Sequence, residues 1–195
     1  MVELEHRSPE PPELTQFRTD NPAATVADFE SPAFKTTKNA VKTALNQDQG
    51  GLCVYCEQTL NSTQGQVEHI KPKAGENAHP DLCFIYTNYA HSCINNKTCG
   101  QKKKSGLLPI EPRKGCNAEW QLSTDGTIQP ISGLTKRRTH DVKQTRDMLG
   151  LNADTNLVIE REKWVKQAQF ILENQPTYFD DFLQEVPFRY ILQML

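Results

Sequence analysis

Apolar side chains recur at helical spacing in several parts of the chain. The first pattern begins at Ser31-Pro32, two residue types that suit the first positions of a helix. Phe34, Val41 and Leu45 then share one face until Gly50-Gly51 ends the pattern. Similar signals predict helices over residues 135–149 and 154–174, and a short basic helix or turn over residues 97–104.

The strand signals are short and few. We predict a strand at Gln66–Ile70 that Pro72 ends, and a second extended segment over residues 84–90. Residues 119–129 are predicted to form a hairpin around Thr124-Asp125-Gly126. Helices beside a few short strands indicate the α+β class.

The two ends of the chain have distinct patterns. Residues 1–30 show no sustained periodicity and contain Pro9, Pro11 and Pro12, which predicts an extended arm that could become ordered on a partner. Residues 179–195 are the most apolar segment. Packing in the core and docking of another protein both explain that segment. We predict docking, so that deletion of residues 179–195 should weaken binding of the partner with unchanged melting, whereas a large drop in melting temperature would indicate core packing.

Leu, Ile, Val and Phe make up 43 of the 195 residues, about 22%, just above the roughly 20% below which chains tend to be disordered. The apolar core is therefore thin, and a bound metal would help to stabilise it. No apolar run is long enough for a membrane span, and the acidic, proline-rich start is unlike a secretory signal. We expect a cytoplasmic protein without a membrane partner.

Charge is strongly segregated although the net charge is only −2. Residues 66–146 carry 13 basic and 7 acidic side chains, whereas the segments on either side each have a net charge of −4. A basic middle between acidic flanks suits a site that binds a polyanion. An ordinary uneven surface explains the pattern equally well.

Six cysteines without a secretory signal indicate a reducing compartment, where spaced thiols more often bind metal than form disulfides. Four of them form a CxxC pair and a C-x5-C pair about 40 residues later: Cys53, Cys56, Cys93 and Cys99. Four thiolates complete the tetrahedral shell of a structural zinc ion. The cysteines at positions 83 and 116 are expected to be buried free thiols.

The segment between the cysteine pairs resembles the signature of HNH nucleases. It contains Glu68-His69-Ile70-Lys71-Pro72-Lys73 and, further on, Tyr86-Thr87-Asn88-Tyr89. Together with Tyr55-Cys56-Glu57 and Cys99-Gly100-Gln101-Lys102-Lys103, it is similar to the PtuB-type HNH endonucleases of Septu and retron-associated anti-phage systems. The likeness covers roughly residues 10–165 and implies a zinc-stapled ββα-metal nuclease core with flanking helices.

Phosphodiester hydrolysis needs a base for the attacking water and a divalent ion for the charge on the phosphate. His69 suits the base because an imidazole is largely neutral at pH 7, and Glu68 offers a hard oxygen ligand for Mg²⁺ or Mn²⁺. Neighbours in a strand point to opposite faces, so both serve one site only where the strand ends. The resemblance assigns Asn88 the task of orienting His69 through a hydrogen bond.

One position departs from the simplest HNH pattern. There, the residue after the last zinc cysteine is Asn or His and ligates the catalytic metal, whereas this chain has Gly100. Asn95 or Asn96 could take that role if their loop folds inward. Sharing of the metal between Glu68, His69 and the substrate phosphate is the alternative.

Several basic side chains surround the motif in sequence and are candidate phosphate contacts. They are Lys71, Lys73, Lys97, Lys102, Lys103 and Lys104, followed by Arg113 and Lys114. A solvated lysine face is the competing explanation.

We therefore expect an arm and helix over residues 1–50, an HNH core with zinc over 51–115, and a hairpin with helices over 116–195 that could pack on the core as one domain. The expected function is metal-dependent endonucleolytic cleavage, of DNA in preference to RNA, in anti-phage defence. The resemblance implies an ABC/SMC-type ATPase subunit as partner and a retron RNA/DNA hybrid as a further candidate. An RNA-cleaving enzyme, a non-catalytic zinc-dependent nucleic-acid-binding subunit and a purely structural partner subunit are the alternatives.

Overall fold

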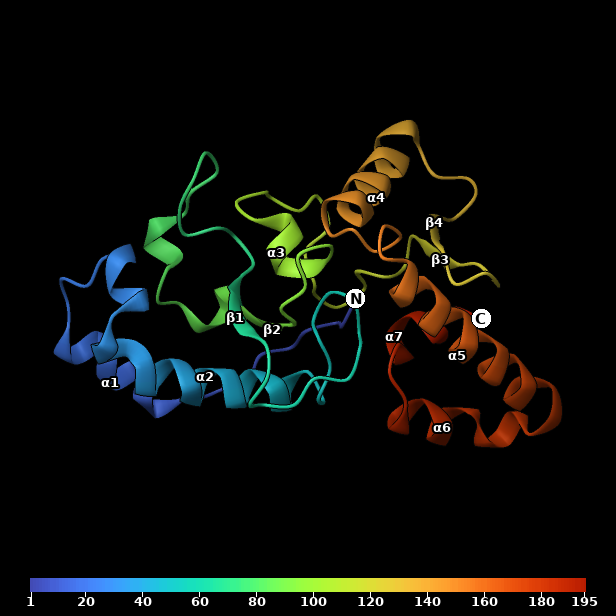
Figure 1. Cartoon of the computed structure of the whole chain (residues 1–195), viewed down its shortest axis with the longest axis horizontal. Helices are drawn as coiled ribbons and strands as arrows, with labels where there is room; N and C mark the ends of the chain where they lie inside the picture. The colour runs from blue at the N-terminus through green and yellow to red at the C-terminus, as the bar shows by residue number, and fades with distance from the viewer.

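A computed structural model describes all 195 residues, and its elements alternate between helices and short strands (Figure 1). The α-helices are α1 (Pro12–Asp20), α2 (Lys35–Asp48), α3 (Cys99–Lys103), α4 (Lys136–Met148), α5 (Thr155–Asn174), α6 (Phe179–Glu185) and α7 (Arg189–Leu192). The strands are β1 (Gln66–His69), β2 (Tyr89–Ser92), β3 (Trp120–Leu122) and β4 (Ile128–Pro130). The 3₁₀ turns are η1 (Val26–Glu30), η2 (Pro32–Phe34), η3 (Pro80–Leu82), η4 (Tyr86–Asn88) and η5 (Pro176–Tyr178). This mixture confirms the α+β class.

Two antiparallel hairpin-like sheets are present, each of two strands. β1 pairs with β2 so that Glu68 lies opposite Ala90 and His69 opposite Tyr89. The expected hairpin is confirmed as β3 and β4, with Gln121 opposite Gln129. Because β1 pairs on one side only, its other edge remains free of strand partners.

The β1–β2 sheet lies between two apolar clusters, because successive side chains of a strand point to opposite faces. Val67 packs with α1, α2 and Tyr89 in the smaller cluster, at the left of Figure 1. Ala90 belongs to the larger cluster, which also contains residues 52–56, the β3–β4 hairpin and the C-terminal helices. That cluster draws residues from all three expected regions of the chain, whose boundaries stay a prediction.

The prediction of an extended arm over residues 1–30 is wrong. The arm forms α1 and η1, and α1 buries Leu14 and Phe17, three residues apart on one helical face. Phe29 joins the same cluster, and the first residues also pack internally, with Val2 fully buried. These apolar residues are too few to give a periodic signal in the sequence. Each is nevertheless buried because it packs against another part of the chain.

The segment 84–90 also differs from the expected extended piece. A 3₁₀ turn at Tyr86–Asn88 comes first, and the strand then runs on to Ser92. Polar residues at the strand's end are buried because the protein satisfies their hydrogen bonds: the His91 N–H donates to Gln49 Oε1 at 2.6 Å, and the ring bonds the Gln64 carbonyl at 2.8 Å.

The apolar tail is part of the core. Leu183, Val186, Phe188, Ile191 and Leu192 are all buried in the larger cluster. Figure 1 shows α6 and α7 folded back beside α5. Most of the apolar tail is therefore packed in the core, and the prediction that it docks a partner protein is wrong for these five residues. No helix of the structure is both long and apolar enough to cross a membrane.

Removal of this tail should therefore destabilise the isolated chain. Deletion of residues 179–195 should lower the melting temperature strongly, and Ile191→Ala alone should cost about 2–5 kcal/mol because it leaves a cavity in the core. Phe170→Ala is the control, since that side chain is 60% exposed and should change stability by less than about 0.5 kcal/mol. Unchanged melting of the truncated protein would contradict core packing.

Candidate nuclease site and zinc centre

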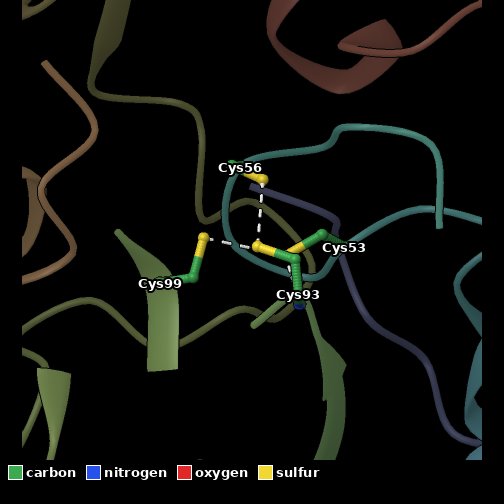
Figure 2. A group of neighbouring side chains, drawn as sticks. All are labelled: Cys53, Cys56, Cys93 and Cys99. Carbon is green, nitrogen blue, oxygen red and sulfur yellow. Dashed lines mark hydrogen bonds between the residues drawn. The ribbon is translucent and has the colours of Figure 1, made fainter. Parts of the chain in front are cut away.

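The four paired cysteines converge on one point between three segments (Figure 2). Cys53 and Cys56 begin and end a short turn after α2 (residues 53–56), which we call the knuckle. Cys93 follows β2, and Cys99 begins α3. Their sulfur atoms lie within 4.8 Å of one another, with Cys53 Sγ 3.7 Å from Cys99 Sγ. Cys56 Sγ lies 3.9 Å from Cys93 Sγ. The arrangement unites both cysteine pairs, as the spacing predicts.

These distances match a tetrahedral zinc site. With Zn–S bonds of about 2.3 Å, the edges of a sulfur tetrahedron are about 3.8 Å, whereas a disulfide needs about 2.05 Å. The Cys93 N–H also donates to Cys53 Sγ at 3.3 Å, a contact that favours thiolate at that sulfur. Burial and the neighbouring thiols raise the pKa of Cys99. Cys53, Cys56 and Cys99 are buried and Cys93 is partly buried, so the four sulfur atoms would become thiolates together only with a bound cation, and zinc fits this ligand set.

The other two cysteines are free and buried, as expected, at positions 83 and 116. Cys83 nevertheless contributes to the site through its backbone. Its carbonyl oxygen lies 3.0 Å from His69 Nε2 and also accepts a hydrogen bond from the Tyr89 hydroxyl. Because a carbonyl only accepts, Nε2 carries the proton and Nδ1 is left with a free lone pair.

His69 is held rigidly in a neutral state. Its ring meets Phe29 edge to face at 4.5 Å between centroids, and Tyr89 at 5.1 Å. Burial, helped by the nearby ammonium groups of Lys73, Lys103 and Lys38, lowers the pKa of His69 to about 4, although the hydrogen bond to the Cys83 carbonyl raises it in part. A neutral imidazole at pH 7 with a fixed ring and a free Nδ1 can accept a proton from water.

Asn88 is not the hydrogen-bond partner of His69 that we expected. Its Oδ1 accepts from the Lys71 N–H at 2.9 Å, and its Nδ2 donates to the carbonyls of Lys71 and Leu82. Asn88 therefore ties the chain just after β1 to the turn that precedes Cys83. It positions the Cys83 carbonyl, and through it His69, instead of touching the ring.

Glu68 points to the opposite face of β1 and pairs with a buried lysine. Lys103 Nζ lies 2.9 Å from Glu68 Oε1, and the lysine side chain is fully buried. The same ammonium donates to the His69 carbonyl at 3.1 Å and to the Lys104 carbonyl at 3.3 Å. All three donors are therefore in use, so the prediction that Lys103 contacts phosphate is wrong.

The other Glu68 oxygen is enclosed too. Gln66 Nε2 lies 3.3 Å from Oε2, and a Cβ on Gly100 would collide with this carboxylate oxygen. The space that a metal ligand at position 100 would need is thus filled by Glu68 itself. Burial raises the pKa of Glu68, and the Lys103 ammonium only partly offsets this effect.

The structure does not bring Asn95 and Asn96 together with Glu68. Asn95 donates to Asp154 Oδ2 at 2.9 Å and accepts from the Lys97 N–H, so it braces the start of α5. Asn96 is exposed on the same loop. Neither lines the cavity that Glu68 and His69 share, so their role as ligands of a divalent ion stays a prediction without support from this arrangement.

That cavity has a volume of about 400 Å³ and runs along the free edge of β1. Four consecutive residues, Gln66–His69, form one side of it. β1 ends at His69, so Glu68 and His69 border one cavity at the end of the strand, where the sequence argument expects both to serve one site. Further lining side chains include Phe29, Lys38, Lys73 and Lys104.

The predicted phosphate-binding lysines separate into groups. Lys73 and Lys104 line the cavity of His69. Lys71 lies instead in a second hollow of about 310 Å³ with Asn88 and Arg113. Lys97, Lys102 and Lys114 are exposed and line neither hollow.

Sequence reasoning missed Phe29, Glu30 and Lys38, all of which border the cavity. Phe29 and Glu30 belong to the segment interpreted as an arm, and Lys38 lies on the polar side of a helical pattern. No residue-type signal marks them. Likewise, the sequence does not reveal that a backbone carbonyl, at Cys83, fixes the histidine.

Purified protein should contain about one zinc ion per chain. Cys56→Ser should abolish zinc binding and give unfolded or insoluble protein, because structural zinc contributes on the order of 10 kcal/mol to a stability of only about 5–15 kcal/mol. Elemental analysis and thermal melts measure both effects. Cys116→Ser, a buried cysteine outside the cluster, should keep the zinc; folded wild-type protein without zinc would refute the assignment.

The stability of the protein should depend on pH through His69. The pKa of His69 is about 4 when folded and 6.5 when exposed, so between these values only the unfolded chain binds the proton. Stability is therefore complete above about pH 6.5 and is lost as pH falls toward 4, by up to about 3 kcal/mol. Denaturation of wild type and His69→Gln across this range measures the difference, and a pH-independent difference would contradict the burial effect.

No family model matches the chain. Along its entire length it is 40% identical to "Retron Vc95 putative HNH endonuclease" of Vibrio cholerae serotype O1 biovar El Tor, and the match covers 99% of that protein. Identity at this level over two whole chains shows common ancestry. The chain therefore belongs to the HNH endonuclease family that this retron protein represents.

Proposed function

We propose that the chain hydrolyses phosphodiester bonds in nucleic acid, DNA in preference to RNA, with His69 as the general base. The observation that carries this proposal is the fixed neutral imidazole, whose Nε2 bonds the Cys83 carbonyl at 3.0 Å while Nδ1 is free. His69 lines a cavity that Lys38, Lys73 and Lys104 also border. A proton acceptor beside a cationic cavity suits attack on an anionic diester.

The reaction proceeds by in-line displacement. His69 Nδ1 takes a proton from water, the water oxygen bonds to phosphorus, and the bond from phosphorus to the leaving ester oxygen breaks. The leaving oxygen then takes a proton from solvent. The Cys83 carbonyl stabilises the imidazolium that forms, because it accepts from Nε2 throughout.

A divalent ion, Mg²⁺ or Mn²⁺, remains part of the proposal as an added requirement for activity. Such an ion keeps several waters and needs only one or two carboxylates together with substrate phosphate. Since Glu68 is paired with Lys103 in the structure, we assign no step of the reaction to the ion.

The finer biological setting rests on the resemblance to the PtuB-type proteins and on the retron name of the Vibrio relative. We propose a role in anti-phage defence, together with an ATPase subunit of the ABC/SMC type and a retron RNA/DNA hybrid. Control by such partners would keep a nuclease inactive until it is needed.

His69 variants test the proposal. His69→Ala and His69→Gln should both reduce cleavage of plasmid DNA by about 10²–10⁴-fold, and His69→Gln should stay closer to wild type in stability because its amide can still donate to the Cys83 carbonyl. Plasmid DNA and total RNA are incubated with each protein, with and without Mg²⁺ or Mn²⁺ and the ATPase, and zinc content and melting serve as fold controls. Undiminished cleavage by both variants would exclude His69 as the base. Cleavage of RNA alone would favour the RNA-cleaving alternative, and binding without any cleavage would favour the non-catalytic one.

A single substitution is not sufficient to test the role of Glu68. Glu68→Ala would leave the Lys103 ammonium buried without a carboxylate, which typically costs about 3–5 kcal/mol. Loss of cleavage in that variant would therefore report on stability as well as on catalysis, and Glu68→Gln combined with Lys103→Met is the more informative protein.

A further inference from the structure

Two ammonium groups lie over the same aromatic ring that packs against His69. Lys73 Nζ is 3.8 Å and Lys38 Nζ is 4.2 Å from the centroid of the Phe29 ring. The two lysines come from distant places, α2 and the loop after β1, and both line the cavity of His69. Cation–π contact with Phe29 fixes their positions without neutralising their charges.

A single carboxylate bridges these lysines. Glu30 Oε2 lies 2.7 Å from Lys38 Nζ, and Oε1 lies 3.3 Å from Lys73 Nζ. The Glu30 side chain is 68% exposed, whereas the lysines are 27% and 22% exposed. The cations thus belong to the wall of the cavity and the anion lies at its mouth. Exposed ion pairs of this kind are weak, each worth at most about 1 kcal/mol.

A phosphodiester resembles the Glu30 carboxylate in its charge and in its hydrogen-bond acceptors. It carries one negative charge, spread over two oxygen atoms that can each accept from a different ammonium group. We propose that Lys38 and Lys73 together bind a backbone phosphate of the nucleic acid beside His69, and that Glu30 occupies this phosphate position in the free protein and competes with the substrate for it. The inference deepens the proposed function and rests on it for the identity of the substrate.

The geometry favours an anion over a metal ion here. Two ammonium groups within hydrogen-bonding distance of one carboxylate repel a divalent cation. The only cluster of metal-ligating side chains in the structure is the cysteine centre. The same two ammonium groups help to keep the imidazole of His69 neutral, which its assigned role requires.

Binding is measured separately from cleavage, in a His69→Gln background that leaves the nucleic acid intact. A fluorescently labelled DNA duplex and a labelled RNA of equal length are the probes, and anisotropy is recorded over a range of salt concentrations. Lys38→Ala and Lys73→Ala should each weaken binding about tenfold and reduce the salt slope by about 1. Glu30→Gln should tighten binding about fivefold.

Matched controls account for the change in net charge. Lys42 lies one helical turn beyond Lys38 on α2, contacts the Thr63 carbonyl and does not line the cavity. Glu13 is an exposed acid on α1 outside the cavity. Lys42→Ala and Glu13→Gln should each change affinity by less than about twofold, since only long-range screened charge is altered.

The outcomes separate this inference from the proposed function. Equal weakening by Lys38→Ala and Lys42→Ala, or equal tightening by Glu30→Gln and Glu13→Gln, would overturn the phosphate site even if wild-type protein cleaves DNA. The expected pattern in a protein that never cleaves would support the site and refute only the catalytic role of His69. Failure of both probes to bind would overturn the inference.

Discussion

The convergence of four cysteine sulfurs is the contact on which the other parts of the site depend. The cluster joins the knuckle after α2 to the end of β2 and to the start of α3. Because Cys99 begins α3 and Lys103 ends it, the metal centre fixes where the Lys103 ammonium lies. That ammonium in turn holds Glu68 and the His69 carbonyl. The cysteine centre thereby determines the position of β1, the strand that carries Glu68 and His69.

The same knuckle also anchors both ends of the chain. Glu57 follows Cys56 in a left-handed conformation, φ 62°, and its carboxylate accepts from the Met1 ammonium at 2.7 Å and from the Tyr190 N–H at 2.8 Å. A thin apolar core is thus supplemented by buried polar contacts to the zinc-binding loop. Arg161 is a further buried polar group of the core: its guanidinium donates to the Gly126 and Leu151 carbonyls.

Arg161 also shows how the charge of the centre is balanced. Burial lowers its pKa to about 10, and the acidic groups of Cys56, Glu57 and Cys99 oppose that shift. A zinc ion with four thiolates carries a net charge of −2, which is costly in a buried place unless cations lie nearby. With zinc bound, the buried guanidinium of Arg161 would offset part of that charge.

The sequence was informative where one residue type determines a structure. Cysteine spacing identified the metal centre, and periodicity with Gly50 and Thr135 placed α2 and α4. The sequence predictions failed where another element of the chain decides whether a side chain is buried or what it contacts. Leu14 and Phe17 form a buried face only because other elements cover it. Asn88 was assigned to His69, but a backbone carbonyl takes that position, and carbonyls leave no trace in residue types.

Gly100 explains why the site opens where it does. A side chain at this position would meet the Glu68 carboxylate, so a bulky residue here requires Glu68 to move, and Glu68 cannot move without leaving Lys103 unpaired in the core. The α3 face of β1 is therefore closed. The opposite face is filled by Phe29 and Tyr89 around His69. The cavity therefore lies along the free edge of β1, where Lys38, Lys73 and Lys104 line it together with His69.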